Sequence, residues 1–259
     1  MTLRERMDAP GKKLVAYLTA GDPSPEVSVD VILAADRAGA DVIELGVPFS
    51  DPSADGVAIQ RAMQRALAGG TGLGKTLGIA AQARARGCRA SLVLFGYLNP
   101  ILVRGVERTL GEAADAGIDG LLVVDLPVDE MGDLLPEARR RRLELIPLVA
   151  PTSTPDRMAR VAELDAAFVY YISIAGVTGA ALSGRGDLAT RVAAVRAAVR
   201  RPVAVGFGIA TPDDAREVAA GADAVVVGSA IVRAIEGHPG GEVDAVAGLV
   251  SALKGAIAG

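Results

Sequence analysis

The chain has 259 residues, of which 51% are hydrophobic and 22% are charged, and its 27 basic and 31 acidic side chains give a formal net charge of −4. This composition is typical of a globular protein and gives no electrostatic reason to expect nucleic acid or a membrane surface as a partner. With one histidine, His238, and one cysteine, Cys88, the chain cannot build a disulfide framework or the usual structural zinc site. Any catalysis would rest on carboxylates, hydroxyls and backbone dipoles.

From the sequence we expect neither a secretory signal nor a membrane span. Residues Met1 to Lys13 are charged throughout and lack the apolar core of a signal peptide. The longest uncharged stretch, Ala166 to Gly184, is too rich in glycine, serine and threonine in its second half to cross a bilayer. We therefore expect a cytoplasmic protein, which agrees with an unpaired cysteine.

Eight short runs rich in Val, Ile, Leu and Tyr predict β-strands. They are almost continuously apolar, which is typical of parallel strands covered on both faces. The predicted strands are Leu14–Ala20, Asp41–Pro48, Ala90–Tyr97, Gly120–Pro127, Glu144–Pro151, Phe168–Ile174, Val203–Ile209 and Ala224–Ile231. Between them, helical spacing predicts helices over Val27–Ala38, Ile59–Leu67, Val106–Ala116, Pro155–Leu164, Ala189–Val199 and Pro212–Ala220.

A weak repeat of the form Ala-Gly-x-Asp precedes the second, fourth and eighth strands, starting at Ala38, Ala116 and Ala220. In each copy the glycine falls where a helix should end in a left-handed residue. Strand and helix alternate eight times without a linker, which favours a single (β/α)₈ barrel domain over residues 1–259 rather than an open doubly wound sheet. The wide gap between the second and third strands predicts an extra loop and helix.

Residues Gly69 to Thr76 fit the phosphate-loop expression G-x-x-x-x-G-K-[ST] of nucleotide-binding proteins. Such a loop follows a buried strand, whereas the preceding Ile59–Leu67 has amphipathic helical spacing. We therefore interpret the glycines as the end of this helix and expect no ATP binding at Lys75.

Carboxylates at the ends of two strands are candidates for catalysis. Glu44 lies inside the apolar second strand, where it is either paired with a basic neighbour or is an acid/base group with a pKa set by an apolar barrel mouth. Catalytic residues of such barrels lie at the carboxyl ends of the strands. Asp51 and Asp55 follow in the next loop, where the residue pattern alone gives them as ordinary turn formers. Asp125 ends the fourth strand, where it is either catalytic or anchors a loop.

Glycine-rich segments follow the last three strands: Gly176–Gly179, Gly206–Ile209 and Gly228–Ala230. Turns of this kind let backbone N–H groups and a helix N-terminus bind a phosphate, although glycine also simply eases tight turns. Tyr170 and Tyr171 are adjacent on the sixth strand, so one of them should face the barrel interior.

Taken in order, these segments resemble the family of tryptophan synthase α subunits, which are (β/α)₈ barrels. The most specific segment is Glu44-Leu45-Gly46-Val47-Pro48-Phe49-Ser50-Asp51-Pro52. The resemblance covers almost the whole chain and also rests on Leu18–Pro23, Ala54–Gly56 with Ile59-Gln60, Asn99–Ile101, Asp125–Pro127, Gly176–Gly179, Gly206–Ile209 and Gly228–Val232.

The resemblance implies a lyase of tryptophan biosynthesis that cleaves indole-3-glycerol phosphate to indole and glyceraldehyde 3-phosphate, with no metal or organic cofactor. It carries the family's general acid/base glutamate to Glu44 and its indole-facing aspartate to Asp55. The substrate-binding positions that it implies are Tyr170, Asp125, Thr178 and, for the phosphate, the backbone of Gly179, Gly208, Gly228 and Ser229.

The resemblance also implies a β subunit that receives the indole through a tunnel, in an α₂β₂ complex. Three features depart from the family pattern: Ile174 where Arg is frequent, Val57-Ala58 after the Asp55-Gly56 pair, and a short N-terminal helix. They leave open a stand-alone lyase that releases free indole, or a weakly active subunit that mainly activates its partner.

Overall fold

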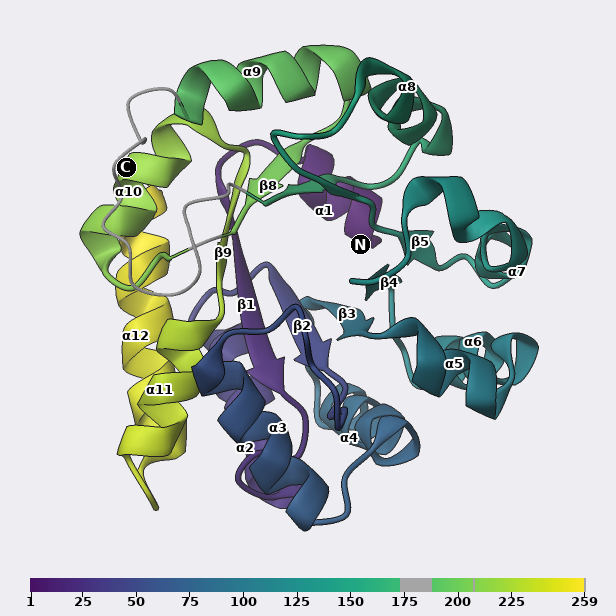
Figure 1. The fold of residues 1–259 in the computed structure, drawn as a ribbon. Helices are drawn as coiled ribbons and strands as arrows, with labels where there is room; N and C mark the ends of the chain where they lie inside the picture. Colours follow the sequence, from purple (N-terminus) through teal and green to yellow (C-terminus); the bar gives the residue numbers. More distant parts are fainter. Residues whose placement is uncertain (173–187, 207, 259) are drawn as a thin grey trace.

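The computed structural model describes residues 1–172, 188–206 and 208–258. Within these ranges, nine strands form one parallel sheet in the order β5-β4-β3-β2-β1-β9-β8-β7-β6, with helices around it (Figure 1). The strands are β1 Lys13–Thr19, β2 Val42–Gly46, β3 Ser91–Gly96, β4 Gly120–Val123, β5 Glu144–Leu145, β6 Leu148–Val149, β7 Val169–Tyr171, β8 Val203–Val205 and β9 Ala224–Val227.

The two outer strands of that order, β5 and β6, are halves of the fifth predicted strand. β5 pairs with β4 and β6 pairs with β7, while only Ile146 and Pro147 separate them in the chain. Hydrogen bonds continue across the joint, since Ile146 N donates to Leu121 O at 2.9 Å and Tyr170 N donates to Pro147 O at 3.0 Å. Proline has no N–H to donate, which interrupts the strand. The sheet therefore closes on itself, and the predicted (β/α)₈ barrel is confirmed.

The six predicted helices are present, and α4 occupies the wide gap after the second strand, whereas several further helices were not predicted. The helices are α1 Leu3–Asp8, α2 Pro25–Arg37, α3 Val57–Ala68, α4 Leu73–Ala85, α5 Leu98–Arg104, α6 Val106–Asp115, the 3₁₀ helix η1 Val128–Asp133, α7 Leu135–Arg140, α8 Pro155–Leu164, α9 Leu188–Val199, α10 Pro212–Gly221, α11 Ser229–Gly237 and α12 Glu242–Ile257. None of these described helices is long and apolar enough to cross a bilayer.

Some local predictions are wrong. The fourth and seventh strands were expected to reach Pro127 and Ile209, but β4 ends at Val123 and β8 ends at Val205. The eighth strand was expected to reach Ile231, but β9 ends at Val227 and Ser229 begins α11. A short apolar run fits a buried helix as well as a strand, and here Ile231 is buried on a helix face. Gly221 is the last residue of α10, and the extended Ala222 ends that helix in place of a left-handed glycine.

Other glycines behave as predicted. Gly39 and Gly117 have φ angles of 104° and 78°, as left-handed helix ends require. The phosphate-loop expression follows the helix α3, which ends at Ala68, and Gly70 has a φ of 73°. The glycines therefore end a helix, which confirms the prediction that this segment is a helix end.

Alternate strand residues face the barrel interior, where α1 closes one end. Leu3 and Met7 of α1 are 1% and 4% exposed and pack in the same cluster as Val15, Val42 and other inward-facing strand residues. Beside them the ammonium of Lys13 donates hydrogen bonds to the carbonyls of Ala9, Pro10 and Gly11 at 2.6–2.9 Å. Since α1 precedes β1, the closed end is the amino end of the strands, and a substrate can enter only from the carboxyl end.

We predict that Leu3→Ala lowers the free energy of unfolding by about 2–5 kcal/mol, because it leaves a cavity in the closed end of the barrel. Urea denaturation measures this change. Leu102→Ala is the control, since Leu102 is 53% exposed and its truncation should change the stability by less than about 0.5 kcal/mol. Equal effects of the two substitutions would contradict the role given to α1.

Candidate active site

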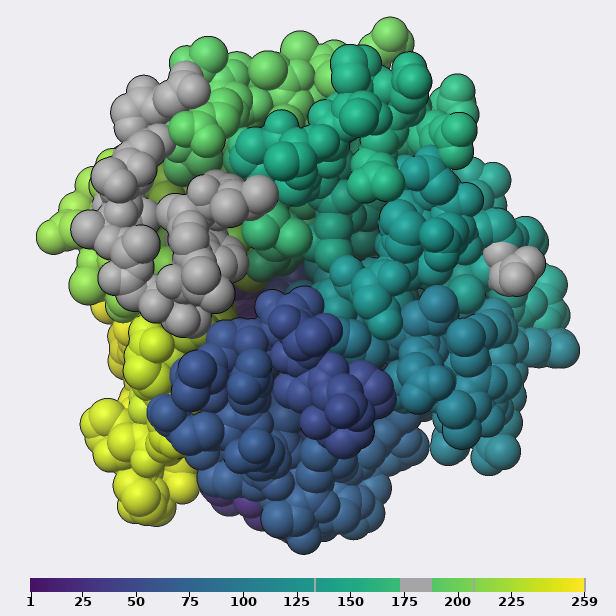
Figure 2. All heavy atoms as spheres, viewed as in Figure 1, coloured from purple at the N-terminus to yellow at the C-terminus, as the bar shows by residue number. Residues whose placement is uncertain are grey.

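The carboxyl end of the barrel is hollowed at its centre, beside the blue atoms of the first quarter of the chain (Figure 2). Glu44 of β2 points into this interior, because Val42, two residues earlier, packs in the interior cluster while Ile43 and Leu45 pack toward the helices. The Glu44 side chain is 1% exposed and its Oε1 atom has no hydrogen-bond partner. No ion pair involves Glu44 within the described part of the chain, which favours an acid/base group over a paired strand-end acid.

Burial raises the pKa of Glu44 from its ordinary value of 4.5 to about 8. The physical cause is desolvation: an apolar barrel cannot replace the water that stabilises a carboxylate. At neutral pH the carboxyl group is mostly protonated. It can therefore donate a proton to a substrate and, once ionised, accept one back.

Two tyrosines form the walls beside Glu44. Tyr17 of β1 lies in register with Glu44, is 2% exposed and contacts the ring of Phe95 edge-on with centroids 5.1 Å apart. Tyr170 of β7 packs in the interior cluster, while Tyr171 packs toward the helices, so Tyr170 is the inward member of the pair. A Cβ atom at Gly206 would lie 2.2 Å from the Tyr170 hydroxyl, so glycine there leaves the room this ring occupies. Burial, together with the charges of Glu44 and Asp55, raises the pKa of Tyr170.

The hydroxyl of Tyr97 holds Asp55 in the loop between β2 and α3. It donates a hydrogen bond to Asp55 Oδ2 at 2.6 Å and accepts one from the Ala54 N–H at 3.0 Å, while Gln60 Nε2 donates to the Asp55 carbonyl at 2.8 Å. Burial raises the pKa of Asp55, and the Tyr97 hydrogen bond opposes that shift. Sequence reasoning missed Tyr97. The one sequence feature that could have indicated a role for Tyr97 is its position directly after β3, shortly before Asn99-Pro100.

Asp125 binds the residue that follows Tyr97, at the start of α5. Its Oδ1 atom accepts a hydrogen bond from the Leu98 N–H at 2.8 Å, and Leu98 is the first residue of that helix. Asp125 is exposed. Of the two interpretations of Asp125, this contact supports the anchoring of a loop. Asp51 is also exposed and accepts a hydrogen bond from Ser50 next to it, as an ordinary turn residue does.

Of the predicted phosphate-binding positions, Gly208, Gly228 and Ser229 lie in the described part of the chain. Gly228 precedes α11 and Ser229 begins it, and no side chain caps this helix, so its first N–H groups are open to an anion. By contrast, Thr211 and Asp214 form a capping box that satisfies the N-terminus of α10. Gly208 lies in the loop before α10 with a φ of 66°. Thr178 and Gly179 lie outside the described residues.

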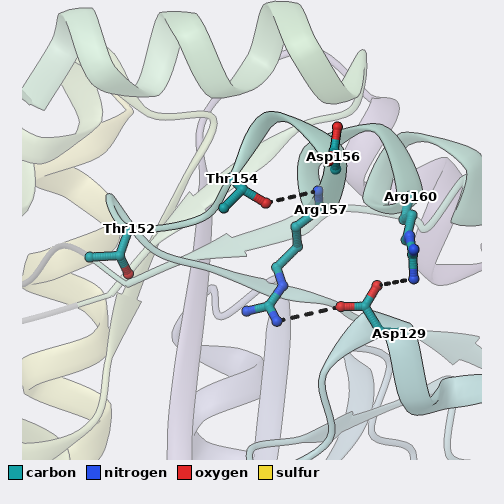
Figure 3. A pocket seen from close by; sticks show the side chains of 6 residues that line it. All are labelled: Asp129, Thr152, Thr154, Asp156, Arg157 and Arg160. Carbon is teal, nitrogen blue, oxygen red and sulfur yellow. Dashed lines mark hydrogen bonds and ion pairs between the residues drawn. The ribbon is translucent and has the colours of Figure 1, made fainter.

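A cavity of about 300 Å³ lies beyond the strand ends between η1 and α8 (Figure 3). Arg157 and Arg160 share a single carboxylate partner, Asp129, at 3.4 and 2.6 Å. None of the predicted site residues lines this cavity, which is bounded by Asp129, Thr152, Thr154, Asp156, Arg157 and Arg160. The candidate active site is therefore the barrel interior. Across the part of the chain that the structure describes, no cluster of three or more His, Cys, Asp or Glu side chains is suited to a metal ion.

The raised pKa of Glu44 predicts a specific pH dependence of stability. Between pH 4.5 and about 8 the folded chain retains a proton on Glu44 that the unfolded chain releases, so this group stabilises the fold less and less as the pH rises through that window. Glu44→Gln lacks this loss. We expect its free energy of unfolding, relative to the unsubstituted chain, to increase from pH 4.5 to pH 8 and then to level off.

Denaturant unfolding at several pH values measures the difference. Glu163→Gln on α8 makes the same chemical change at an exposed position and should show no such trend. A difference between Glu44→Gln and the unsubstituted chain that does not change between pH 5 and 8 would contradict the buried, protonated state of Glu44.

Comparisons with known proteins agree with this geometry. A family model described as "Tryptophan synthase alpha chain" matches residues 3–256. The tryptophan synthase alpha chain of Geobacter sulfurreducens is 49% identical over 95% of this chain and 93% of its own length. The corresponding protein of Neisseria meningitidis is 44% identical over 95% of both chains.

Solved structures give the same result. Tryptophan synthase subunit alpha from Legionella pneumophila superposes with a TM-score of 0.92 at 35% identity, over 99% of this chain and 98% of that chain. A structure of Mycobacterium tuberculosis tryptophan synthase matches with a TM-score of 0.87 at 36% identity, over 99% of this chain and 95% of that chain. The barrel is closed at one end and holds a buried glutamate at the other, as described above. Because the family model matches residues 3–256 and the relatives are this similar, the chain belongs to the tryptophan synthase alpha chain family.

Proposed function

We propose that this chain cleaves indole-3-glycerol phosphate to indole and glyceraldehyde 3-phosphate, the α reaction of tryptophan synthase, as one domain spanning residues 1–259. The observation that carries this proposal is Glu44, a buried and unpaired carboxyl group facing the interior at the open end of the barrel. Asp55 lies in the loop that follows the same strand, and the uncapped N-terminus of α11 supplies an anion site. Membership of the family supports the same reaction.

The chemistry requires one proton to be given and one to be taken. Glu44, protonated at neutral pH, donates its proton to C3 of the indole ring, which leaves the ring cationic. The carboxylate then accepts the proton of the hydroxyl on the adjacent side-chain carbon. The O–H electron pair becomes the carbonyl of glyceraldehyde 3-phosphate, and the C–C bonding pair returns to the ring to give neutral indole.

Asp55 stabilises the positive charge that this proton transfer places on the ring. The charge is shared with the indole nitrogen, and an ionised carboxylate next to that N–H lowers the energy of the cation. Tyr97 keeps the Asp55 carboxylate in place through its 2.6 Å hydrogen bond and favours the ionised form. In this arrangement Tyr97 positions Asp55, and Asp55 interacts with the substrate.

At the other end of the substrate, the phosphate binds to backbone N–H groups. Gly208, Gly228 and Ser229 supply donors next to the start of α11, and Thr178 and Gly179 complete this part of the proposal. Tyr170 lines the space between phosphate and ring, and Asp125 holds the first turn of α5 beside Tyr97. The chain needs no metal or organic cofactor for these steps.

We also propose that the chain works with a β subunit, as an α₂β₂ complex in the cytoplasm. The solved structures of tryptophan synthase from Mycobacterium tuberculosis, which this chain resembles, support the partner. Leu102 and Val103 on α5 are 53% and 80% exposed, near the open end of the barrel, and give such a partner an apolar surface. Cys88 is unpaired, which fits a reducing compartment.

We predict that Glu44→Gln lowers kcat for indole release from indole-3-glycerol phosphate by at least about 10³-fold, because the amide can neither donate nor accept the transferred proton. Substrate binding, measured by calorimetry, should change little because the amide fills the same space. Glu163→Gln on α8 is the control and should retain full activity. Near-normal turnover by Glu44→Gln would refute the assignment.

A second experiment tests the partner. Mixing the purified chain with a tryptophan synthase β subunit should increase the rate of indole-3-glycerol phosphate cleavage and move both proteins to a larger species in size-exclusion chromatography. If the rate and the size stay unchanged while the isolated chain cleaves the substrate rapidly, the chain is a stand-alone lyase that releases free indole, and the proposed complex is wrong.

A further inference from the structure

We infer that an ion-pair network between α3, α11 and the β1–α2 loop sets the distance between the indole site and the phosphate site. The network, called here the Arg65 clamp, consists of Arg65 and Arg61 on α3, Asp22 in the β1–α2 loop and Glu236 on α11. Its members are positioning residues, since none lies among the residues proposed to contact the substrate. The inference rests on the proposed function, because it concerns how that substrate fits.

Arg65 binds Asp22 through two nitrogen atoms on one edge of its guanidinium group. Its Nε and Nη2 atoms donate to Asp22 Oδ1 and Oδ2 at 2.8 and 2.9 Å. The Asp22 side chain is 1% exposed and lies directly beyond the end of β1. A paired, planar contact of this kind fixes orientation as well as distance. The clamp therefore ties α3 to the barrel wall.

The third nitrogen of Arg65 connects α3 to α11. Its Nη1 atom donates to Glu236 Oε1 at 2.9 Å. Arg61, one turn earlier on the same helix face, donates to both Glu236 oxygens at 2.9 and 2.8 Å. The hydrogen bonds from Arg61, with those from Arg65, lower the pKa of Glu236, so this carboxylate stays ionised.

The two helices carry opposite ends of the proposed site at their N-termini. α3 begins at Val57, two residues after Asp55, and its Gln60 side chain binds the Asp55 carbonyl. α11 begins at Ser229 in the proposed phosphate site. The helices are in contact (Figure 1), and Ala62 of α3 and Val232 of α11 pack together with Tyr17.

The pairs that Glu236 makes with Arg61 and Arg65 matter more for the relative position of the two helices than for overall stability. The side chains of Arg61, Arg65 and Glu236 are about one third to one half exposed, and ion pairs of that kind contribute little to the free energy of unfolding. A small change in the angle between α3 and α11, however, alters the spacing between Asp55 and Ser229. Displacement of a substrate by about 1 Å can cost up to about 10²-fold in rate.

The test compares a substrate that spans both sites with fragments that occupy only one. In Glu236→Gln we expect kcat/KM for indole-3-glycerol phosphate to fall about 5- to 20-fold. The inhibition constants of indole and of glycerol 3-phosphate should stay within about twofold, because neither fragment senses the spacing. The pH dependence of kcat should also be unchanged, because Glu44 is not affected.

Three variants control the comparison. Glu163→Gln on α8 makes the same change at an exposed position, and Arg233→Gln changes an exposed residue of α11 that belongs to none of these pairs; both should behave as the unsubstituted chain does. Adding Arg61→Gln to Glu236→Gln should cause little further loss, since both remove the same ion pair.

Two results would overturn the inference. One is full activity of Glu236→Gln towards indole-3-glycerol phosphate. The other is an equal loss of affinity for the fragments and of kcat/KM for the substrate, which indicates general damage to the site. Failure of the proposed function is recognised separately, because the unsubstituted chain would then not cleave indole-3-glycerol phosphate at all.

Discussion

The burial of one carboxyl group in an apolar barrel is the constraint around which this molecule is organised. Glu44 is 1% exposed, and burial raises its pKa to about 8. Other carboxylates of this chain, such as Glu137 and Glu112, have arginine partners, and hydrogen bonds from those arginines lower their pKa values. Glu44 lacks such a partner among the described residues. The fold therefore maintains a neutral acid at neutral pH, at the cost of desolvating its charged form.

The alternation of side chains along the strands determines which residues surround Glu44. Inward-facing positions alternate with positions that pack against helices, so Tyr17, Glu44 and Tyr170 meet inside while Tyr171 does not. Closure at Ile146 and Pro147 brings β7 round to complete the wall. α1 fills the amino end, and α3 and α11 bring Asp55 and an uncapped helix N-terminus to the open end.

Much of this could be predicted from the sequence, because the signals were local. Apolar runs located the strands, and the carboxylate within the second run singled out Glu44. The division of the fifth strand and the start of α11 at Ser229 were not predicted, because an apolar run does not reveal pairing or distinguish a strand from a buried helix. Tyr97 and the Arg65 clamp depend on contacts 42 and 171 residues apart, which spacing within a segment does not encode.

The central claim is that Glu44 holds its proton at neutral pH. The most direct measurement is the infrared band of the protonated carboxyl group in the unsubstituted chain minus that in Glu44→Gln, followed from pH 5 to pH 10. A titration with a midpoint near pH 8 is the result predicted here. A carboxyl group that is already ionised at pH 6, with a midpoint near the ordinary value of 4.5, would contradict it.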